Sequence, residues 1–139
     1  MERVSLEREY EADPAAVRRT IRRDPEAFVG AAGFDEVVFA GDRVTFARSL
    51  GLASIELTVE LDHDADAVLA FDAVEGIFDE MRTEYVVEPT DAGSRVTAWT
   101  EFTLGGALAS AFDGTLVATQ RRREFADQLE YLESALGEK

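Results

Sequence analysis

The chain has 139 residues, with 29 acidic and 14 basic side chains and a formal net charge of −15. This length predicts one domain over 1–139, because domains cluster around ~100–150 residues. The absence of cysteine excludes disulfides, thiolate nucleophiles and cysteine metal sites. The negative charge disfavours nucleic acid as a partner, since phosphate binding needs a positive surface. Without an apolar run of ~20 residues or a signal-like N-terminus, we expect a cytoplasmic protein that needs no cofactor.

The basic residues are almost all arginine, and Lys139 is the only lysine. An acidic excess with so little lysine resembles the proteins of halophilic archaea, which work in molar potassium salt. At ~1 M salt the Debye length is ~3 Å, so the self-repulsion of such a charge is largely screened. The alternative interpretation is an ordinary acidic protein.

The first third of the chain predicts one strand and two short helices. Residues 2–11 alternate between apolar and polar side chains, which indicates a half-buried strand. An Asp-Pro pair at 13–14 and another at 24–25 each place a helix N-cap before a proline at the first helical position. The first helix has about ten residues, and Gly30 and Gly33 end the second.

From residue 34 to about residue 103 the hydrophobic pattern has a period of two. Turn signals divide this stretch at Gly41-Asp42, Gly51, 62–66, Gly76 and 89–93. Residues 55–61 alternate cleanly, whereas 68–74 is apolar on both parities and is predicted to be covered on both sides. Six strands joined by tight turns predict an antiparallel meander.

The last part of the chain predicts one long helix. Leu108 and Phe112 begin it, and Asp113-Gly114 is expected either to kink it or to split off a first turn. Its apolar stripe comprises Phe125, Leu129, Leu132 and Leu136. The predicted class is therefore α+β, in the order β-α-α-β6-α, with a curved seven-stranded antiparallel sheet wrapped around a long C-terminal helix.

This order resembles the START-like, helix-grip superfamily (SRPBCC), which includes birch-pollen allergens and polyketide cyclases. Segments with the same texture are ADPAAV at 12–17, DPE at 24–26, GSRV at 93–96 and GGALA at 105–109. The tail is similar to the CoxG and coenzyme-Q-binding branches. The resemblance implies an apolar cavity between sheet and C-terminal helix, and non-catalytic binding or transfer of a lipid, an isoprenoid quinone or a polyketide-like molecule. A minority of this superfamily are enzymes, so the resemblance leaves an enzymatic role open.

Catalytic and metal-binding patterns are weak. His63 lies in an acidic turn, where a solvated side chain is the favoured interpretation. The aspartates at 62, 64 and 66 have the spacing of a calcium loop, but Ala67 and Ala73 replace its glycine and glutamate. We therefore expect no metal site and no catalytic residues, which makes an enzyme the less favoured interpretation. The alternatives are a protein-interaction or accessory domain, and a cyclase- or dehydratase-type enzyme in which Arg48, Asp72 and Tyr85 converge.

Ligand contacts are expected from side chains on the apolar parity of the strands, together with the start of the last helix. The polar candidates are Arg48, Tyr85, Asp72, Thr83 and Thr100, with Arg8 as a further one. The apolar candidates are Phe46, Leu57, Phe102, Leu108 and Phe112. An inward Arg48 would need a carboxylate such as Asp72, or a ligand oxygen, because a buried charge must be paired. The alternative is a strand-end arginine that reaches solvent.

Two features concern the surface. Trp99 lies on the polar parity of its strand and faces outward, unless a shift of one residue turns it into the cavity. Arginines cluster at 18–23 and at 121–123. These clusters either pair locally with acids, as Arg121 could with Glu124, or form a basic patch. Such a patch would make transient contact with an anionic membrane surface or bind an acidic partner.

Overall fold

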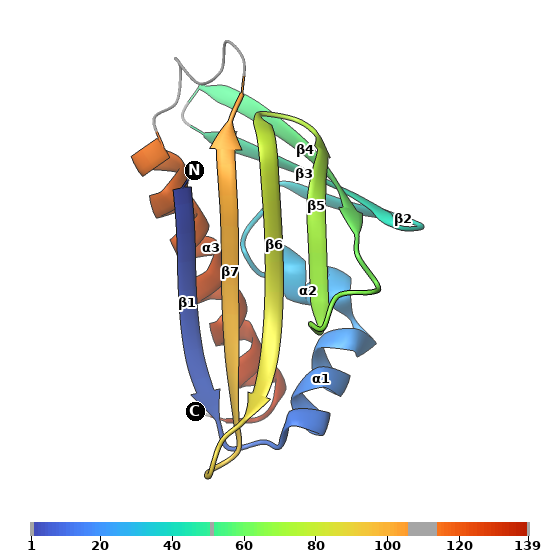
Figure 1. Cartoon of the computed structure of the whole chain (residues 1–139), viewed down its shortest axis with the longest axis vertical. Coiled ribbons are helices and arrows are strands. Elements are labelled where there is room, and N and C mark those ends of the chain that lie inside the picture. The colour runs from blue at the N-terminus through green and yellow to red at the C-terminus, as the bar shows by residue number, and fades with distance from the viewer. Residues whose placement is uncertain (1, 51, 106–113, 139) are drawn as a thin grey trace.

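The computed structural model describes residues 2–50, 52–105 and 114–138. This part of the chain contains seven strands and three helices in the predicted order (Figure 1). The strands are β1 (Glu2–Tyr10), β2 (Glu36–Ala40), β3 (Arg43–Leu50), β4 (Ala53–Leu61), β5 (Leu69–Glu75), β6 (Phe78–Pro89) and β7 (Ser94–Leu104). The helices are α1 (Pro14–Arg23), α2 (Pro25–Gly30) and α3 (Gly114–Ala135).

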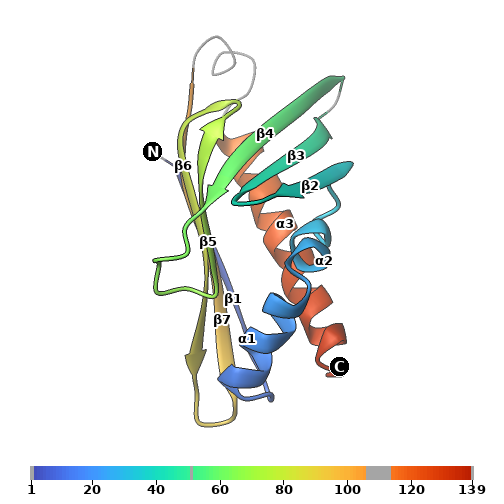
Figure 2. The same cartoon turned by 90° about the vertical axis from the view of Figure 1, so that its right-hand side faces the viewer.

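The strands form one sheet in the order β1-β7-β6-β5-β4-β3-β2, and every neighbouring pair is antiparallel. The first strand, β1, therefore pairs with the last strand, β7. Strands β2 to β7 are neighbours in chain order and form the predicted antiparallel meander. The helices lie on one face of the sheet, and β2, β3 and β4 turn toward that face (Figure 2). The β4–β5 register shifts between Thr58 and Val59, and such a bulge bends a strand. The predicted curved α+β fold is confirmed.

Both short helices begin at the predicted caps. The Asp13 carboxylate accepts a hydrogen bond from the Ala16 amide at 2.8 Å, and Asp24 accepts one from Ala27 at 3.0 Å. Each aspartate therefore satisfies an amide that has no partner inside the helix. Among the described residues, no helix is both long enough and apolar enough to cross a lipid bilayer.

The core lies between the sheet and α3. On β6 and β7 the predicted inward parity is buried, while the alternate residues are partly exposed. Phe125, Leu129 and Leu132 of α3 are fully buried against these strands. Tyr10 at the end of β1 donates a hydrogen bond to the Leu129 carbonyl at 2.7 Å, which fixes the helix to the edge of the sheet.

The structure bears on two sequence-based expectations, one about the run 68–74 and one about the start of the last helix. The run 68–74 was predicted to be covered on both sides, but Val74 is 42% exposed. The prediction is wrong at that end because the helices pack on one face of the sheet only. Leu108, Phe112 and the predicted kink at 113–114 involve residues outside the described part of the chain, which resumes where α3 begins at Gly114.

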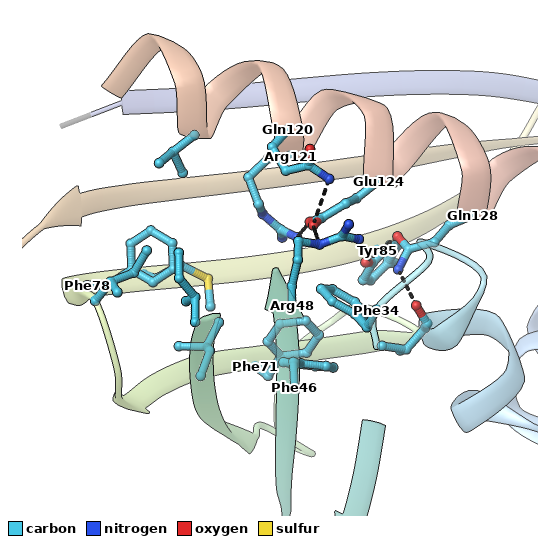
Figure 3. A pocket seen from close by; sticks show the side chains of 16 residues that line it. Phe34, Phe46, Arg48, Phe71, Phe78, Tyr85, Gln120, Arg121, Glu124 and Gln128 are labelled. Carbon is cyan, nitrogen blue, oxygen red and sulfur yellow. Dashed lines mark hydrogen bonds and ion pairs between the residues drawn. The ribbon is translucent and has the colours of Figure 1, made fainter. Parts of the chain in front are cut away.

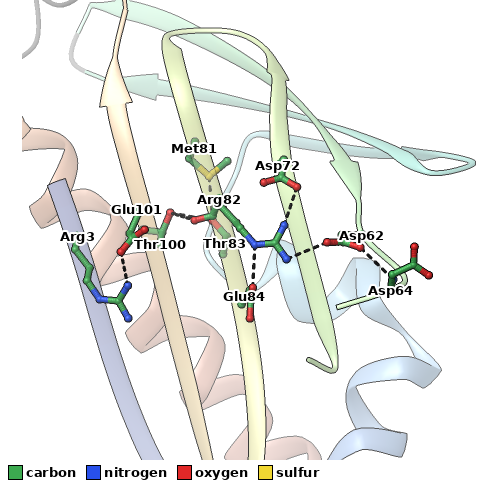
Figure 4. A network of polar contacts seen from close by, with 10 residues as sticks. All are labelled: Arg3, Asp62, Asp64, Asp72, Met81, Arg82, Thr83, Glu84, Thr100 and Glu101. Carbon is green, nitrogen blue, oxygen red and sulfur yellow. Dashed lines mark hydrogen bonds and ion pairs between the residues drawn. The ribbon is translucent and has the colours of Figure 1, made fainter. Parts of the chain in front are cut away.

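The outer face of the sheet carries a network around Arg82 (Figure 4). This guanidinium contacts Asp62 at 3.0 Å, Asp72 at 2.7 Å and Glu84 at 2.8 Å. The hydrogen bond from Arg82 holds the pKa of Asp62 below its usual value. Trp99 belongs to the same face, as its parity predicts. It is half-buried, and the Arg3 guanidinium lies 4.8 Å from its ring centre.

Candidate functional site

A cavity lies between the curved half of the sheet and α3 (Figure 3). Its lining is mostly apolar: Val29, Phe34, Phe46, Arg48, Ile55, Leu57, Phe71, Ile77, Phe78, Met81, Tyr85, Val117, Gln120, Arg121, Glu124 and Gln128. The cavity volume is about 70 Å³, whereas small-molecule sites have roughly 300–1,000 Å³. A ligand of ordinary size can therefore enter only if lining side chains move apart.

Aromatic rings form one continuous wall of this cavity. The rings of Phe34 and Phe46 stack with centres 4.8 Å apart, and Phe71 lies 5.9 Å from Phe46. The Tyr85 ring follows at 6.4 Å from Phe71. Because β2–β4 turn toward the helices (Figure 2), β3 brings Phe46 and Arg48 to face α3 across the cavity (Figure 3).

Glu124 is the centre of the polar side of the cavity. Its carboxylate lies 2.9 Å from Arg48 Nε, and it accepts a hydrogen bond from Arg121 Nη1 through the other oxygen. The Gln120 amide approaches the same carboxylate at 3.5 Å. The exposed fraction is 4% for the Glu124 side chain, 19% for Arg48 and 12% for Arg121. One buried carboxylate therefore forms ion pairs with two guanidinium groups.

Arg48 joins three parts of the molecule. Its Nη2 donates to the Ala32 carbonyl at 2.8 Å, and its guanidinium lies 4.8 Å from the Phe34 ring centre. Arg48 Nε is buried and close to Glu124, yet it makes no hydrogen bond with good geometry to any described residue. The contact of Arg48 Nε with Glu124 is therefore an ion pair without a well-aligned hydrogen bond.

Arg121 extends the polar side onto the sheet. Its Nη2 donates to Thr83 Oγ1 at 3.0 Å. Thr83 Oγ1 donates a hydrogen bond to Thr100 Oγ1 at 2.9 Å, and Thr100 Oγ1 in turn donates to the Arg82 carbonyl at 3.0 Å. Both threonines are fully buried. These hydroxyls hold the Arg121 guanidinium in position, because a buried polar group keeps its hydrogen bonds.

Tyr85 is committed to a second chain of hydrogen bonds. Its hydroxyl donates to Gln128 Oε1 at 2.6 Å, and Gln128 Nε2 donates to the Val29 carbonyl at 3.0 Å. Burial raises the pKa of Tyr85 above its usual value. The phenol therefore stays neutral at physiological pH and tethers α3 to β6 and α2.

Most of the predicted site residues fall into three groups. Arg48, Tyr85, Phe46 and Leu57 line the cavity. Thr83, Thr100 and Phe102 are fully buried on the same face of the sheet, beneath the lining. Leu108 and Phe112 lie outside the described residues.

Two polar candidates lie elsewhere. Asp72 contacts Arg82 on the outer face, so the expected Arg48–Asp72 pair does not form. The reason is register, because Asp72 shares its parity with the exposed Val74. Arg8 is at the edge of the sheet, 3.9 Å from Glu133 of α3. His63 is exposed and lies 2.8 Å from Asp42 in the turn region.

α3 contributes polar side chains to the cavity that the sequence pattern does not predict. The pattern predicts Arg121 in a surface cluster, with its Glu124 pairing at the surface. Both residues instead face the cavity with Gln128. Residues 121, 124 and 128 are at i, i+3 and i+7, beside the apolar stripe. Polar side chains at core spacing were the available signal.

No family model and no curated protein matches the sequence. Solved structures show the fold. The protein TTHA0849 from Thermus thermophilus has a TM-score of 0.75 at 20% identity, over 97% of each chain. A START superfamily protein from Mycobacterium smegmatis has a TM-score of 0.64 at 11% identity, over 97% of each chain. The Zhui aromatase/cyclase from Streptomyces sp. R1128 has a TM-score of 0.60 at 17% identity, over 98% of this chain and 92% of its own. The chain therefore has the START-like, helix-grip fold.

Proposed function

We propose that this protein binds an apolar small molecule without transforming it, in the cavity between the sheet and α3. The observation that carries the proposal is the aromatic and aliphatic lining, in which a few polar groups converge from α3 and β3. Binding sites combine these features, because apolar surface supplies affinity and a few polar groups orient the ligand. The similarity in fold to a START superfamily protein is consistent with this role. A lipid, an isoprenoid quinone or a polyketide-like molecule are the classes that the sequence resemblance suggests.

The cavity is too narrow to hold such a ligand unless it widens. A volume of about 70 Å³ accommodates only a few water molecules. Phe34 is only half-buried, so its ring can move outward with less loss of buried apolar surface than a buried lining residue such as Phe46. We propose that displacement of the Phe34 ring opens the site.

The same narrowness favours a second candidate, an accessory domain that binds another protein and keeps its cavity closed. That alternative predicted an outward apolar surface at Trp99. The Arg3 guanidinium covers the Trp99 ring, and Arg3 itself pairs with Glu101 at 2.6 Å. The two candidates differ in one measurable property, which is whether the cavity takes up a neutral apolar probe.

For a cyclase-type enzyme, the hypothesis required Arg48, Asp72 and Tyr85 to converge on one substrate position. Arg48 and Tyr85 line the cavity, but Asp72 lies on the opposite face of the sheet. The hydroxyl of Tyr85 donates to Gln128. This trio therefore does not supply the paired acid and base that such a mechanism needs.

Titration with the neutral fluorophore N-phenyl-1-naphthylamine in molar potassium chloride tests the proposal. We expect saturable fluorescence enhancement in the wild-type protein. Leu57→Trp places a larger side chain in the lining and should weaken binding at least tenfold. Glu56→Trp is the matched control, because this neighbour on β4 is exposed and should bind like the wild type.

Organic extraction of the purified protein, followed by mass spectrometry, identifies any ligand that co-purifies. A folded wild-type protein that binds no neutral probe and yields no extract would contradict the proposal and favour the accessory-domain alternative.

A further inference from the structure

The formal charges around the cavity do not cancel. Arg48 and Arg121 each carry one positive charge, and Glu124 carries one negative charge. Tyr85 is the remaining ionisable group among the described lining residues, and it is neutral at pH 7, since a phenol has an ordinary pKa of about 10 and burial raises the pKa of Tyr85 further. The lining therefore has a net charge of +1 in a chain whose formal net charge is −15.

The outer face of the same sheet shows the opposite balance. There, the single Arg82 guanidinium contacts three carboxylates, from Asp62, Asp72 and Glu84. Acidic residues are abundant on this protein, yet the two cavity arginines share one. An uncompensated buried charge is costly unless a counter-ion pairs with it. The unequal pairing indicates that a second anion belongs in the cavity.

The arginines also retain hydrogen-bond donors. A guanidinium has five N–H groups. Arg48 uses Nη2 on the Ala32 carbonyl, while its buried Nε makes no hydrogen bond to any described residue. The two guanidiniums flank Glu124 at the α3 side of the aromatic wall (Figure 3). An oxyanion beside Glu124 would be attracted by the positive charge of both guanidiniums and could accept hydrogen bonds from their N–H groups.

We propose that the occupant of the cavity is an amphipathic monoanion. Its head, a carboxylate or another singly charged oxyanion, binds Arg48 and Arg121, and its apolar body packs on the aromatic wall that includes Phe46 and Phe71. The head brings the net charge of the cluster to zero and provides an acceptor for Arg48 Nε. This inference rests on the proposed function, because it specifies the class of molecule that the same cavity takes.

A matched pair of fluorescent probes tests the inference. 1-Anilinonaphthalene-8-sulfonate has the anilinonaphthalene body of N-phenyl-1-naphthylamine together with one sulfonate. Both are titrated in molar potassium chloride, which screens the overall repulsion of an anion by the protein. The readout is the ratio of the two dissociation constants, because changes in the apolar wall move both constants together.

We expect Arg48→Met and Arg121→Met each to weaken binding of the anionic probe about tenfold, with binding of the neutral probe changed less than about threefold. Arg122→Met is the control, since this neighbouring arginine on α3 is exposed. Thermal melts establish that each variant is folded.

Glu124→Gln provides a change of opposite sign. It removes the internal counter-ion and leaves the side chain almost unchanged in size, so the anionic probe should bind at least threefold more tightly. A purely structural Glu124 would predict weaker binding of both probes.

The outcomes separate this inference from the proposed function. Binding of the neutral probe, combined with anion binding that none of the Arg48, Arg121 and Glu124 variants changes, would overturn the inference and leave the proposed function standing. Failure of both probes to bind the folded wild type would contradict the proposed function itself.

Discussion

At Glu124, one carboxylate holds two guanidinium groups that arrive from different elements. Arg48 comes from β3 and Arg121 from the preceding turn of α3, and both side chains are at least four-fifths buried. Removing one partner of a buried ion pair leaves the other uncompensated, which costs more than the pair contributes to stability. The cluster therefore positions charge in the cavity more than it stabilises the fold.

The Tyr85–Gln128 hydrogen bond gives the first residue-scale prediction. Tyr85→Phe leaves the buried Gln128 oxygen without its donor, so unfolding free energy should fall by about 1–3 kcal/mol. Denaturant unfolding measures the change. Tyr131→Phe is the control, because that tyrosine is only half-buried, and an equal loss in both variants would contradict the assigned role of this hydrogen bond.

The buried tyrosines also predict the response to alkali. Burial raises the pKa of Tyr10 and of Tyr85 above the ordinary value of about 10. Above that pH the unfolded chain releases these protons while the folded chain keeps them, so stability falls as pH rises. Unfolding free energy measured from pH 8 to 11 should decline above about pH 10.

Tyr10→Phe and Tyr85→Phe should each reduce the slope of that decline. A slope that neither substitution alters would show that other groups control unfolding in alkali.

At the scale of elements, the β5–β6 turn places Ile77 and Phe78 in the cavity lining. Gly76 precedes them with φ of +133°, and a Cβ there would lie 3.0 Å from both the Glu56 carbonyl oxygen and Leu57 Cδ1. The turn is thus packed directly on β4. A side chain at this position must displace the backbone that supports the end of the cavity.

Gly76→Ala should therefore destabilise the protein by about 1–3 kcal/mol. Gly41→Ala is the matched control, since Gly41 also has a positive φ of +64° but has open space around a Cβ. It should cost about 1 kcal/mol. Denaturant unfolding compares the two, and equal losses would mean that backbone conformation alone, without the contact to β4, controls position 76.

For the whole molecule, we expect the net charge of −15 to dominate the response to salt. Acids are spread over the outer strand parities, the turns and the exposed helix faces, with few basic residues among them. Their mutual repulsion opposes the compact state and is screened as salt rises. This behaviour is what the halophile-like composition predicts.

The melting temperature should rise with potassium chloride from 0.1 to 2 M. A variant with exposed acids neutralised, such as Glu26→Gln, Asp91→Asn and Glu130→Gln combined, should melt higher at low salt and gain less from added salt. A melting temperature independent of salt in the wild type would contradict the role of charge repulsion.

The sequence by itself determined the order of elements and the face of most strands. The alternation on β6 and β7 placed Tyr85, Thr83 and Thr100 inward, because the side-chain period of a strand is local and equals two. The Asp-Pro pairs located both short helices for the same reason, since a cap acts within one turn.

Only the tertiary structure decided which charges meet. Asp72 and Glu124 were both available to Arg48, and the packing of α3 on the curved sheet brought Glu124 to it while register placed Asp72 beside Arg82. Arg121 faced inward because α3 lies across the cavity. Contacts between residues far apart in the chain, such as Arg48 and Glu124, depend on sheet curvature and helix packing, which no local period encodes, and these contacts define the site.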